Sequence, residues 1–483
     1  MSHQSTRREF LQTTAACGAL WFMAAGCGTQ GGQGRESPAA AAAGPKVISP
    51  GCRKSKVQVA KLYLGRPGAH WPMPQMDIAE ERRSYEDEFL RMKKEFADVE
   101  FVVNELVTSE TQARALKEKL QNVDGVLVIH LSMGIMGMLA EVLAAGKPTM
   151  LFAAPYSGHE WTGFGQLCKR PEGALLDCLL TSDRSQLAVA VRPFRAIHHL
   201  REAKILDVTT NDVSGYAKQM KEKFGTEIVQ VSRERVLAAY QAVPEAEAAV
   251  EARKWIDGAE KIIEPSREEI AKSLRLALAF ERLMDQENAT LITVDCYGSM
   301  WRQLPAYPCI GHARLNGMGL GGMCESDLPS SMTQIILQGL SGRPGFVTDP
   351  TMDLSKEGIV LAHCMGTPRM DGPDGPAAPY QLRTIMERQE GAVCQVRMRT
   401  GQPVTQAELI GTGRMIFFTG RIIETPDLPR GCRTKITVKV DGDVQKLWQN
   451  WSHGLHRVTC YGNLKEDLAR FCRFKAIELT DEA

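Results

Sequence analysis

The chain has 483 residues, of which 58 are Lys or Arg and 57 are Asp or Glu, so its formal net charge at pH 7 is +1. This length predicts about three domains, with cores large enough to fold without covalent support. The balanced charge argues against a nucleic-acid-binding protein, and an aromatic content of 6% argues against a surface that stacks single-stranded bases. The 13 cysteines form no Cys-x-x-Cys pair, so the sequence contains no thiolate zinc motif.

The N-terminus carries the pattern of an export signal. Two arginines, Arg7 and Arg8, precede a Phe-Leu pair, and an apolar stretch of small residues follows over 15–25. This pattern resembles a twin-arginine signal, and its end, Ala-Ala-Gly before Cys27, is similar to a lipoprotein box. We therefore expect residues 1–27 to be a signal whose Cys27 is lipidated in the mature protein, with simple cleavage at an Ala-x-Ala-like site as the alternative.

Residues 28–56 are rich in Gly, Ala, Ser and Pro and predict a flexible tether. Beyond the N-terminus, no apolar run approaches the roughly 20 residues that a membrane-spanning helix needs. We expect a protein that is exported by the twin-arginine (Tat) route and is either periplasmic or held to the membrane only through a lipid anchor.

Strands and helices alternate over residues 57–180, which predicts an N-terminal α/β domain with a parallel sheet. The helix after the first expected strand carries an apolar stripe at spacings of four, three and four residues, formed by Tyr85, Phe89, Met92 and Phe96. We assign this stripe to core packing.

Residues 181–353 predict a second domain of the same type, and residues 354–483 predict an antiparallel β domain because short alternating strands are interrupted there by Gly and Pro. The expected elements of the second domain include strands at 227–231 and 290–294 and helical stretches at 235–263 and 267–286. The predicted fold class is α/β, with two doubly wound, Rossmann- or flavodoxin-like parallel-sheet domains followed by a C-terminal antiparallel β domain.

A glycine-rich stretch lies in the second domain. Gly317-x-Gly319-x-x-Gly322 matches the spacing of a dinucleotide-binding motif, but polar residues precede it where that motif needs a hydrophobic strand. Since the strand–turn–helix context is missing, we do not expect a nicotinamide cofactor.

Two acidic residues near this stretch are candidates for chemistry. Glu325 comes just before an expected helix at 328–340, and Asp349 follows an expected strand at 345–347. Acids at the carboxyl ends of neighbouring strands project into the crevice where open α/β sheets bind ligands. Two carboxylates there can bind a hard divalent cation, exchange protons with a substrate, or do both. The alternative is that Glu325 caps the helix and Asp349 caps a turn before Pro350.

A third segment, around His456, has features that belong with those of the two acids. Glu325 lies in Glu-Ser-Asp, a Leu- and Met-rich helix separates it from Asp349, and His456 precedes a strand that ends in Tyr-Gly. Together these segments resemble the L-fucose isomerase family and, more distantly, L-arabinose isomerase. The resemblance implies that Glu325, Asp349 and His456 bind one divalent metal, most often Mn²⁺, and Mg²⁺ or Co²⁺ also suits such a mixed oxygen and nitrogen ligand set. It further implies a sugar as substrate and a homo-oligomer.

The residue types suit the chemistry of these isomerases. Aldose–ketose isomerisation moves a proton between C1 and C2 of the sugar through an enediol, and a metal that polarises the carbonyl favours this step. Glu325 and Asp349 would be both ligands and catalytic proton shuttles, whereas His456 would be a ligand only.

Other polar and aromatic residues are candidate substrate contacts. The predicted contacts are His159, Trp161, Asp295, Arg314, Asn316, His363 and Trp451. Packing is the alternative for the aromatic residues, and a hydrogen-bonded core position is the alternative for His363. The adjacent His198 and His199 are expected at the surface or at a helix end, because neighbouring residues of a helix point apart.

These observations predict a metal-dependent sugar isomerase of the fucose and arabinose isomerase class. The alternative is a non-catalytic envelope sugar-binding protein that kept the isomerase fold. A third possibility is another metal-assisted reaction on a carbohydrate.

Overall fold

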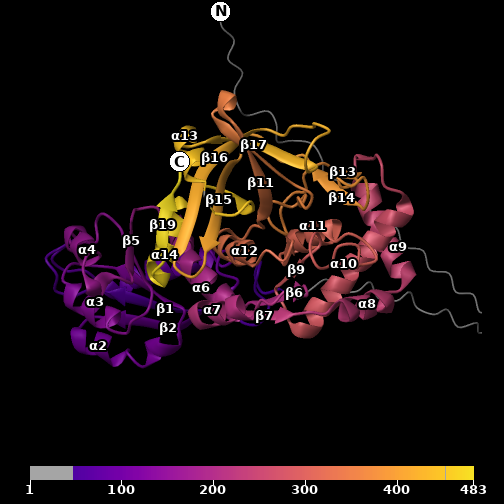
Figure 1. The fold of residues 1–483 in the computed structure, drawn as a ribbon. Helices are drawn as coiled ribbons and strands as arrows, with labels where there is room; N and C mark the ends of the chain where they lie inside the picture. Colours follow the sequence, from indigo (N-terminus) through magenta and orange to yellow (C-terminus); the bar gives the residue numbers. More distant parts are fainter. Residues whose placement is uncertain (1–46, 452) are drawn as a thin grey trace, which may run out of the picture. The chain divides into compact units, whose positions relative to one another are not determined.

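The computed structural model describes residues 47–451 and 453–483, which form two parallel sheets and a C-terminal antiparallel sheet (Figure 1). The predicted signal with Cys27 and most of the predicted tether lie outside the described residues. Within the described part of the chain, none of the helices combines the length and the apolar character needed to cross a membrane.

The first sheet has five parallel strands in the order β2-β1-β3-β4-β5. Helices cover both of its faces, so the central strands are almost wholly buried. The predicted stripe from Tyr85 to Phe96 packs into the core on one face, which confirms that expectation. The strands are β1 Val57–Leu64, β2 Val99–Val107, β3 Gly125–His130, β4 Thr149–Ala153 and β5 Leu176–Leu180. The helices are α1 Ile78–Arg91, α2 Glu110–Ala115, α3 Met136–Leu143, α4 Trp161–Leu167, α5 Leu187–Ala190 and α6 Arg192–Glu202.

The second sheet has four parallel strands in the order β10-β9-β6-β7. Pro244 divides the helical stretch expected at 235–263 into two helices, because proline starts a helix more readily than it continues one. The strands are β6 Lys204–Val208, β7 Glu227–Gln230, β9 Leu291–Val294 and β10 Gly321–Cys324. The helices are α7 Ser214–Phe224, α8 Arg233–Ala242, α9 Glu245–Gly258, α10 Arg267–Glu287, α11 Cys309–Gly317 and α12 Leu328–Ser341.

The C-terminal sheet is a barrel. Six antiparallel strands pair in the ring β15-β18-β11-β12-β17-β16, which β15 and β16 close, and β19 adds a parallel strand to β16. The strands are β11 Phe346–Asp353, β12 Gly358–His363, β15 Pro403–Ile410, β16 Arg414–Glu424, β17 Thr434–Val440, β18 Arg457–Tyr461 and β19 Glu478–Asp481. The remaining elements are α13 Val444–Asn450, α14 Lys465–Lys475 and a small sheet of β8 Lys261–Ile262, β13 Tyr380–Arg383 and β14 Val393–Val396.

Helix α12 joins the second sheet to the barrel. It contacts β9 and β10 on one side and β15 and β18 on the other, and almost all of its residues are buried. The start of α12 therefore lies where the two sheets meet, and the candidate site is at this start.

The predicted class, α/β with parallel sheets and a C-terminal antiparallel sheet, is confirmed. The expected position of Asp349 on the second parallel sheet is wrong. The strand does not end at Val347 but continues to Asp353 as β11, and it pairs with β12 and β18 of the barrel. The polar residues around Pro350 resemble a loop in sequence, yet they form a strand because β12 folds back onto them as a hairpin.

Candidate metal centre

Glu325, Asp349 and His456 converge at the start of α12. Glu325 follows β10 directly, Asp349 lies within β11, and His456 immediately precedes β18. Because β11 and β18 are antiparallel neighbours with Thr348 opposite Arg457, Asp349 and His456 come next to each other. The Nε2 atom of His456 lies 3.2 Å from Asp349 Oδ1 and 3.9 Å from Glu325 Oε2.

Asp327 sets the orientation of the His456 ring. His456 Nδ1 donates to Asp327 Oδ2 over 3.1 Å, which turns Nε2 toward Glu325 and Asp349. The other oxygen of Asp327 caps α12 by accepting from the backbone N–H of Ser330. Asp327 therefore fixes the ring relative to the helix, which is the role of the carboxylate behind a metal-binding histidine. The helix cap considered for Glu325 belongs to Asp327, and Asp349 lies in a strand and does not cap a turn.

The backbone between β10 and α12 adopts an unusual conformation. Glu325 and Ser326 have φ values of 61° and 54°, in the left-handed region that residues with a side chain rarely occupy. Ser326 holds this turn by donating from its hydroxyl to Asp207 Oδ1 over 2.7 Å. Two consecutive left-handed residues are a strained arrangement that the surroundings must stabilise, and such turns are often found at functional sites.

His363 joins the same cluster from the end of β12. Its ring packs edge-on against His456, with 5.3 Å between the ring centroids. Its Nδ1 atom is buried without a hydrogen-bond partner among the described residues. One donor atom each of Asp349, His363 and His456 lies within 4.8 Å of the others, and Cys324, Glu325 and His363 form an overlapping group of the same kind. His363, predicted as a substrate contact, is therefore also placed as a possible ligand.

The donor atoms at this centre are close enough together that they could hold a cation. Asp349 Oδ1 has no aligned hydrogen-bond partner in the described residues, although His456 Nε2 is only 3.2 Å away. Buried polar atoms are normally hydrogen-bonded, so the position of Asp349 Oδ1 is compatible with a further partner such as a cation. Carboxylate oxygens with imidazole nitrogen suit Mn²⁺, Mg²⁺ or Co²⁺, and Glu325, Asp349, His456 and His363 are the residues that could hold such an ion.

The environment shifts the pKa values of Glu325 and Asp349 in opposite directions. Burial raises the pKa of the Glu325 carboxyl. The charge of His456 acts to lower this pKa, but the negative charge of Asp349 raises it further. Burial acts in the same direction on Asp349, but the His456 imidazole beside it holds the pKa of Asp349 below its usual range. Two carboxyls with opposite shifts at one site can serve as proton donor and proton acceptor.

The two histidines also differ. Burial acts to lower the pKa of His456, but its contacts with Asp327 and Asp349 raise it to about 10. Burial and the charge of His456 lower the pKa of His363 to about 4. His363 is therefore neutral with a free lone pair at neutral pH, whereas a cation at His456 Nε2 must displace a proton.

Two further buried acids surround the cluster. Burial raises the pKa of Asp207, the partner of Ser326, to about 6. Burial also raises the pKa of Glu408, which accepts from the hydroxyl of Ser330 over 3.2 Å. Neither residue was predicted, although Asp207 lies near the carboxyl end of the parallel strand β6, so the rule that selects acids at strand ends could have found it.

Three of the predicted substrate contacts are committed to structural interactions. Asp295 Oδ2 accepts from Thr209, Asn211 and the backbone of Ser299, which ties the ends of β6 and β9 together. Arg314 pairs with two acids, Glu251 and Glu281, on neighbouring helices. Asn316 hydrogen-bonds both backbone groups of Gly322. The polar groups of Arg314 and Asn316 already have partners within the fold, which favours a packing role for both residues.

The aromatic candidates lie in other surroundings. His159 packs on Trp71 with 4.2 Å between ring centroids, and Trp161 is an exposed residue of α4 that lines a hollow with Arg473. Trp451 covers the guanidinium of Arg457, the residue after His456, at 3.4 Å from the ring centroid. The contacts of His159 and Trp161 involve no residue of the metal-centre cluster, whereas Trp451 borders it through Arg457.

The glycine motif has a packing role. Gly317 ends α11 and Gly322 lies in β10, so the order is helix–turn–strand, the reverse of a dinucleotide-binding motif. A Cβ atom on Gly322 would lie 2.5 Å from His312 Cα, which explains why this position needs glycine. Gly319 has a φ of 83°, in the left-handed region that glycine adopts easily.

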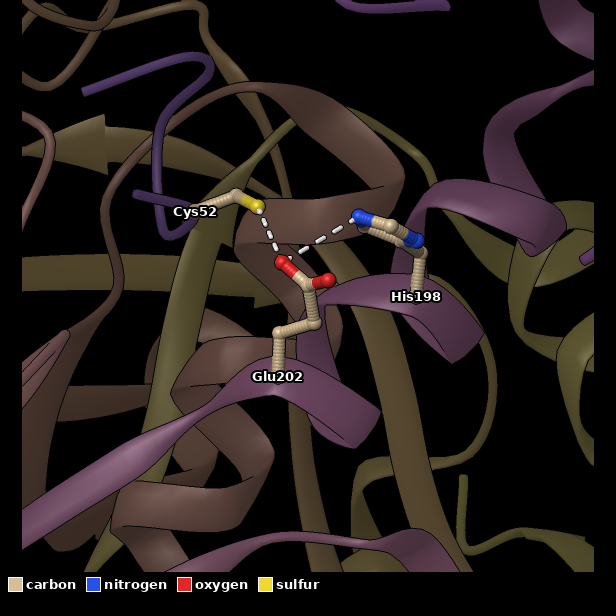
Figure 2. A group of neighbouring side chains, drawn as sticks. All are labelled: Cys52, His198 and Glu202. Atoms are coloured by element: carbon tan, nitrogen blue, oxygen red, sulfur yellow. Dashed lines mark hydrogen bonds and ion pairs between the residues drawn. The ribbon is translucent and has the colours of Figure 1, made fainter. Parts of the chain in front are cut away.

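A second polar cluster joins Cys52, His198 and Glu202 on and beside α6 (Figure 2). Both ring nitrogens of His198 are already engaged, since Nδ1 donates to Asp124 over 2.7 Å and Nε2 donates to the carbonyl of Ser55 over 3.0 Å. Burial acts to lower the pKa of His198, but Asp124 and the other partners raise it to about 10. The cluster is therefore an ion-pair network that anchors the segment before β1.

The adjacent histidines lie near the C-terminal end of α6, as expected, with His199 in its last turn, but the expected surface position is wrong. His198 and His199 are both buried, because α6 packs between the first sheet and α12.

No protein-family model matches the chain, and no curated protein is similar to it in sequence. The resemblance to sugar isomerases therefore rests on Glu325, Asp349, His456 and the segments around them.

Proposed function

We propose that the protein is a metal-dependent aldose–ketose isomerase of the fucose and arabinose isomerase class. The observation that carries the proposal is the approach of His456 Nε2 to 3.2 Å from Asp349 Oδ1 and 3.9 Å from Glu325 Oε2, with the three residues coming from separate segments. The strand order of the first sheet supports a doubly wound, flavodoxin-like domain at the N-terminus.

The residues of the centre have different roles in the proposed reaction. When bound, a divalent cation would polarise the sugar carbonyl and stabilise negative charge on the sugar oxygens. Asp349, with its lowered pKa, is ionised and can accept the proton from C2 of the sugar, while Glu325, with its raised pKa, can deliver a proton to C1. The proton of the C2 hydroxyl passes to the oxygen on C1, and proton exchange with solvent returns the two carboxyls to their starting states. Asp327 holds the ring of His456 in place.

A second candidate function is a sugar-binding protein that kept the centre without turnover. The observation that favours it is the structural commitment of Arg314 and Asn316, which leaves fewer polar side chains free to orient a sugar. Export by the twin-arginine route, a lipid anchor at Cys27 and assembly into a homo-oligomer remain part of the proposal.

The test is turnover of a panel of aldoses by the full chain loaded with Mn²⁺. We expect ketose formation and solvent deuterium incorporation at the sugar carbon, both abolished in Glu325→Gln, which also loses Mn²⁺ affinity. Glu357→Gln is the matched control, because Glu357 is an exposed glutamate paired with Lys439. Sugar and metal binding without ketose formation in the wild type would favour the binding protein, and a wild type that binds no divalent metal would refute both functions.

A further inference from the structure

A second group of metal-ligating side chains adjoins the metal centre. It consists of Cys364, Glu387 and Cys432, whose donor atoms all lie within 4.8 Å of one another. Cys432 Sγ lies 3.7 Å from Glu387 Oε1 and 3.8 Å from Asp349 Oδ2. This group, here called the thiol cluster, therefore meets the metal centre at Asp349.

The fold explains why two distant cysteines meet. Strands β12 and β17 are antiparallel neighbours, with His363 opposite Thr434 at the end of the ladder. Cys364 continues from β12 and Cys432 precedes β17, so both thiols emerge at the same end. Glu387 reaches them from the turn between β13 and β14.

No basic side chain of the described residues forms an ion pair within the thiol cluster. Among the described residues, Glu387 forms no ion pair, and the basic residues near it are engaged elsewhere. Arg388 lies over the ring of Trp301, Arg433 bonds Thr384 and Glu264, and Lys435 donates to the carbonyl of Leu428. A carboxylate thus faces two thiols without a positive partner, and it is exposed, which leaves a route from solvent.

The donor set matches a thiophilic ion. Two sulfurs and a carboxylate oxygen are typical zinc ligands, and in a tetrahedral zinc site a sulfur and an oxygen lie about 3.5 Å apart. The observed separation of 3.7 Å between Cys432 Sγ and Glu387 Oε1 is close to this value before any adjustment of the side chains. A hard ion such as Mn²⁺ would prefer the oxygen and nitrogen donors next to it.

We propose that Cys364, Cys432 and Glu387 form a second cation site for Zn²⁺, distinct from the centre of Glu325, Asp349 and His456. Binding releases the two thiol protons to solvent. Asp349 directs Oδ1 toward His456 and accepts a hydrogen bond from the Cys432 thiol at Oδ2, so loss of the thiol proton on ion binding removes one partner of the carboxylate that the neighbouring centre uses.

Cobalt(II) titration of the reduced, metal-free full chain tests the proposal, because thiolate ligands give Co²⁺ an intense charge-transfer absorption. We expect this absorption in the wild type, its loss in Cys432→Ser and its retention in Cys178→Ser, which replaces a half-buried cysteine of β5. Glu325→Gln should lose Mn²⁺ and keep the cobalt absorption, so failure of this proposal is distinguishable from failure of the proposed function.

Glu387→Gln covers the case in which Cys432→Ser does not fold, as circular dichroism would show. Glu387 is exposed, so the variant should fold, keep the absorption and bind Co²⁺ at least about tenfold more weakly. A reduced wild type without thiolate absorption would overturn the proposal, as would an absorption that survives in the double variant Cys364→Ser/Cys432→Ser.

Discussion

Asp349 of β11 lies next to His456, the residue before the antiparallel neighbour β18, with 3.2 Å between Asp349 Oδ1 and His456 Nε2. The barrel therefore supplies two of the three predicted ligands as a rigid pair. Glu325 comes from the parallel sheet, through a turn that Ser326 and Asp207 hold in place.

Asp327 should act on metal affinity through His456. Asp327→Asn keeps a helix-capping side chain but removes the charge behind the imidazole, so we expect Mn²⁺ affinity to fall about 10- to 100-fold with little change in stability. Asp327→Ala should also cost about 1 kcal/mol of unfolding free energy through the lost cap. Calorimetric Mn²⁺ titration and urea unfolding measure the two effects. Asp443→Asn, at the cap of α13, is the control and should leave Mn²⁺ affinity unchanged.

His198 should make stability depend on pH. Its pKa is about 10 in the folded protein and about 6.5 in an unfolded chain, so its charged contacts stabilise fully below pH 6.5 and are lost as the pH rises toward 10. The stability advantage of the wild type over His198→Asn should thus shrink by at most about 1.4 kcal/mol per pH unit over this range. Urea unfolding at several pH values tests this. His70→Asn, at an exposed position, should show the pH dependence of the wild type.

Arg457 forms a buried ion pair with Glu482 beneath Trp451. Arg457→Met leaves the Glu482 carboxyl buried without its partner, and we expect a loss of about 3–5 kcal/mol in unfolding free energy. Adding Glu482→Gln should recover part of this loss, because the unpaired charge is gone. If Arg457→Met costs no more than removal of the exposed Lys439–Glu357 pair, which we expect to cost under about 1 kcal/mol, the ion pair does not stabilise the fold.

Gly322 should be intolerant of any side chain. Gly322→Ala brings a methyl group against the backbone of His312 and should destabilise the protein by about 1–3 kcal/mol. Thermal unfolding measures the loss, and Gly413→Ala is the control because a Cβ atom there meets nothing. Binding of a nicotinamide dinucleotide by the wild type that Gly322→Ala abolishes would contradict the packing role.

The predicted signal can be tested in cells. Cys27→Ala should release the protein from the membrane fraction, because the acyl anchor is lost. Replacing Arg7 and Arg8 with Lys should retain the precursor in the cytoplasm. Membrane association that survives Cys27→Ala would contradict the lipid anchor, and continued export of the Lys variant would contradict the twin-arginine route.

The sequence was informative about His456, because a clear apolar strand follows it. Glu325 was expected between a glycine-rich stretch and a helix, and the end of that stretch forms the strand β10. The strand that carries Asp349 was cut short in the prediction, because Pro350 and its polar neighbours resemble a loop and only pairing with β12 makes them a strand.

Contacts between residues that are far apart in the sequence could not be predicted from local sequence patterns. Arg314 resembles a substrate-binding residue until the helices that carry Glu251 and Glu281 are in place. The same holds for Cys364 and Cys432, which meet only through the register of β12 and β17 and belong to no local cysteine motif.

The origin of the proposed ligands in two different sheets would have a thermodynamic consequence. A cation held by Glu325 on one side and by Asp349 and His456 on the other would crosslink the parallel sheet to the barrel, so ion binding and sheet docking would become one coupled equilibrium. An ion at 100 times its dissociation constant would then add about 2.7 kcal/mol to the free energy of unfolding. The melting temperature of the protein would then rise with the concentration of the free metal ion.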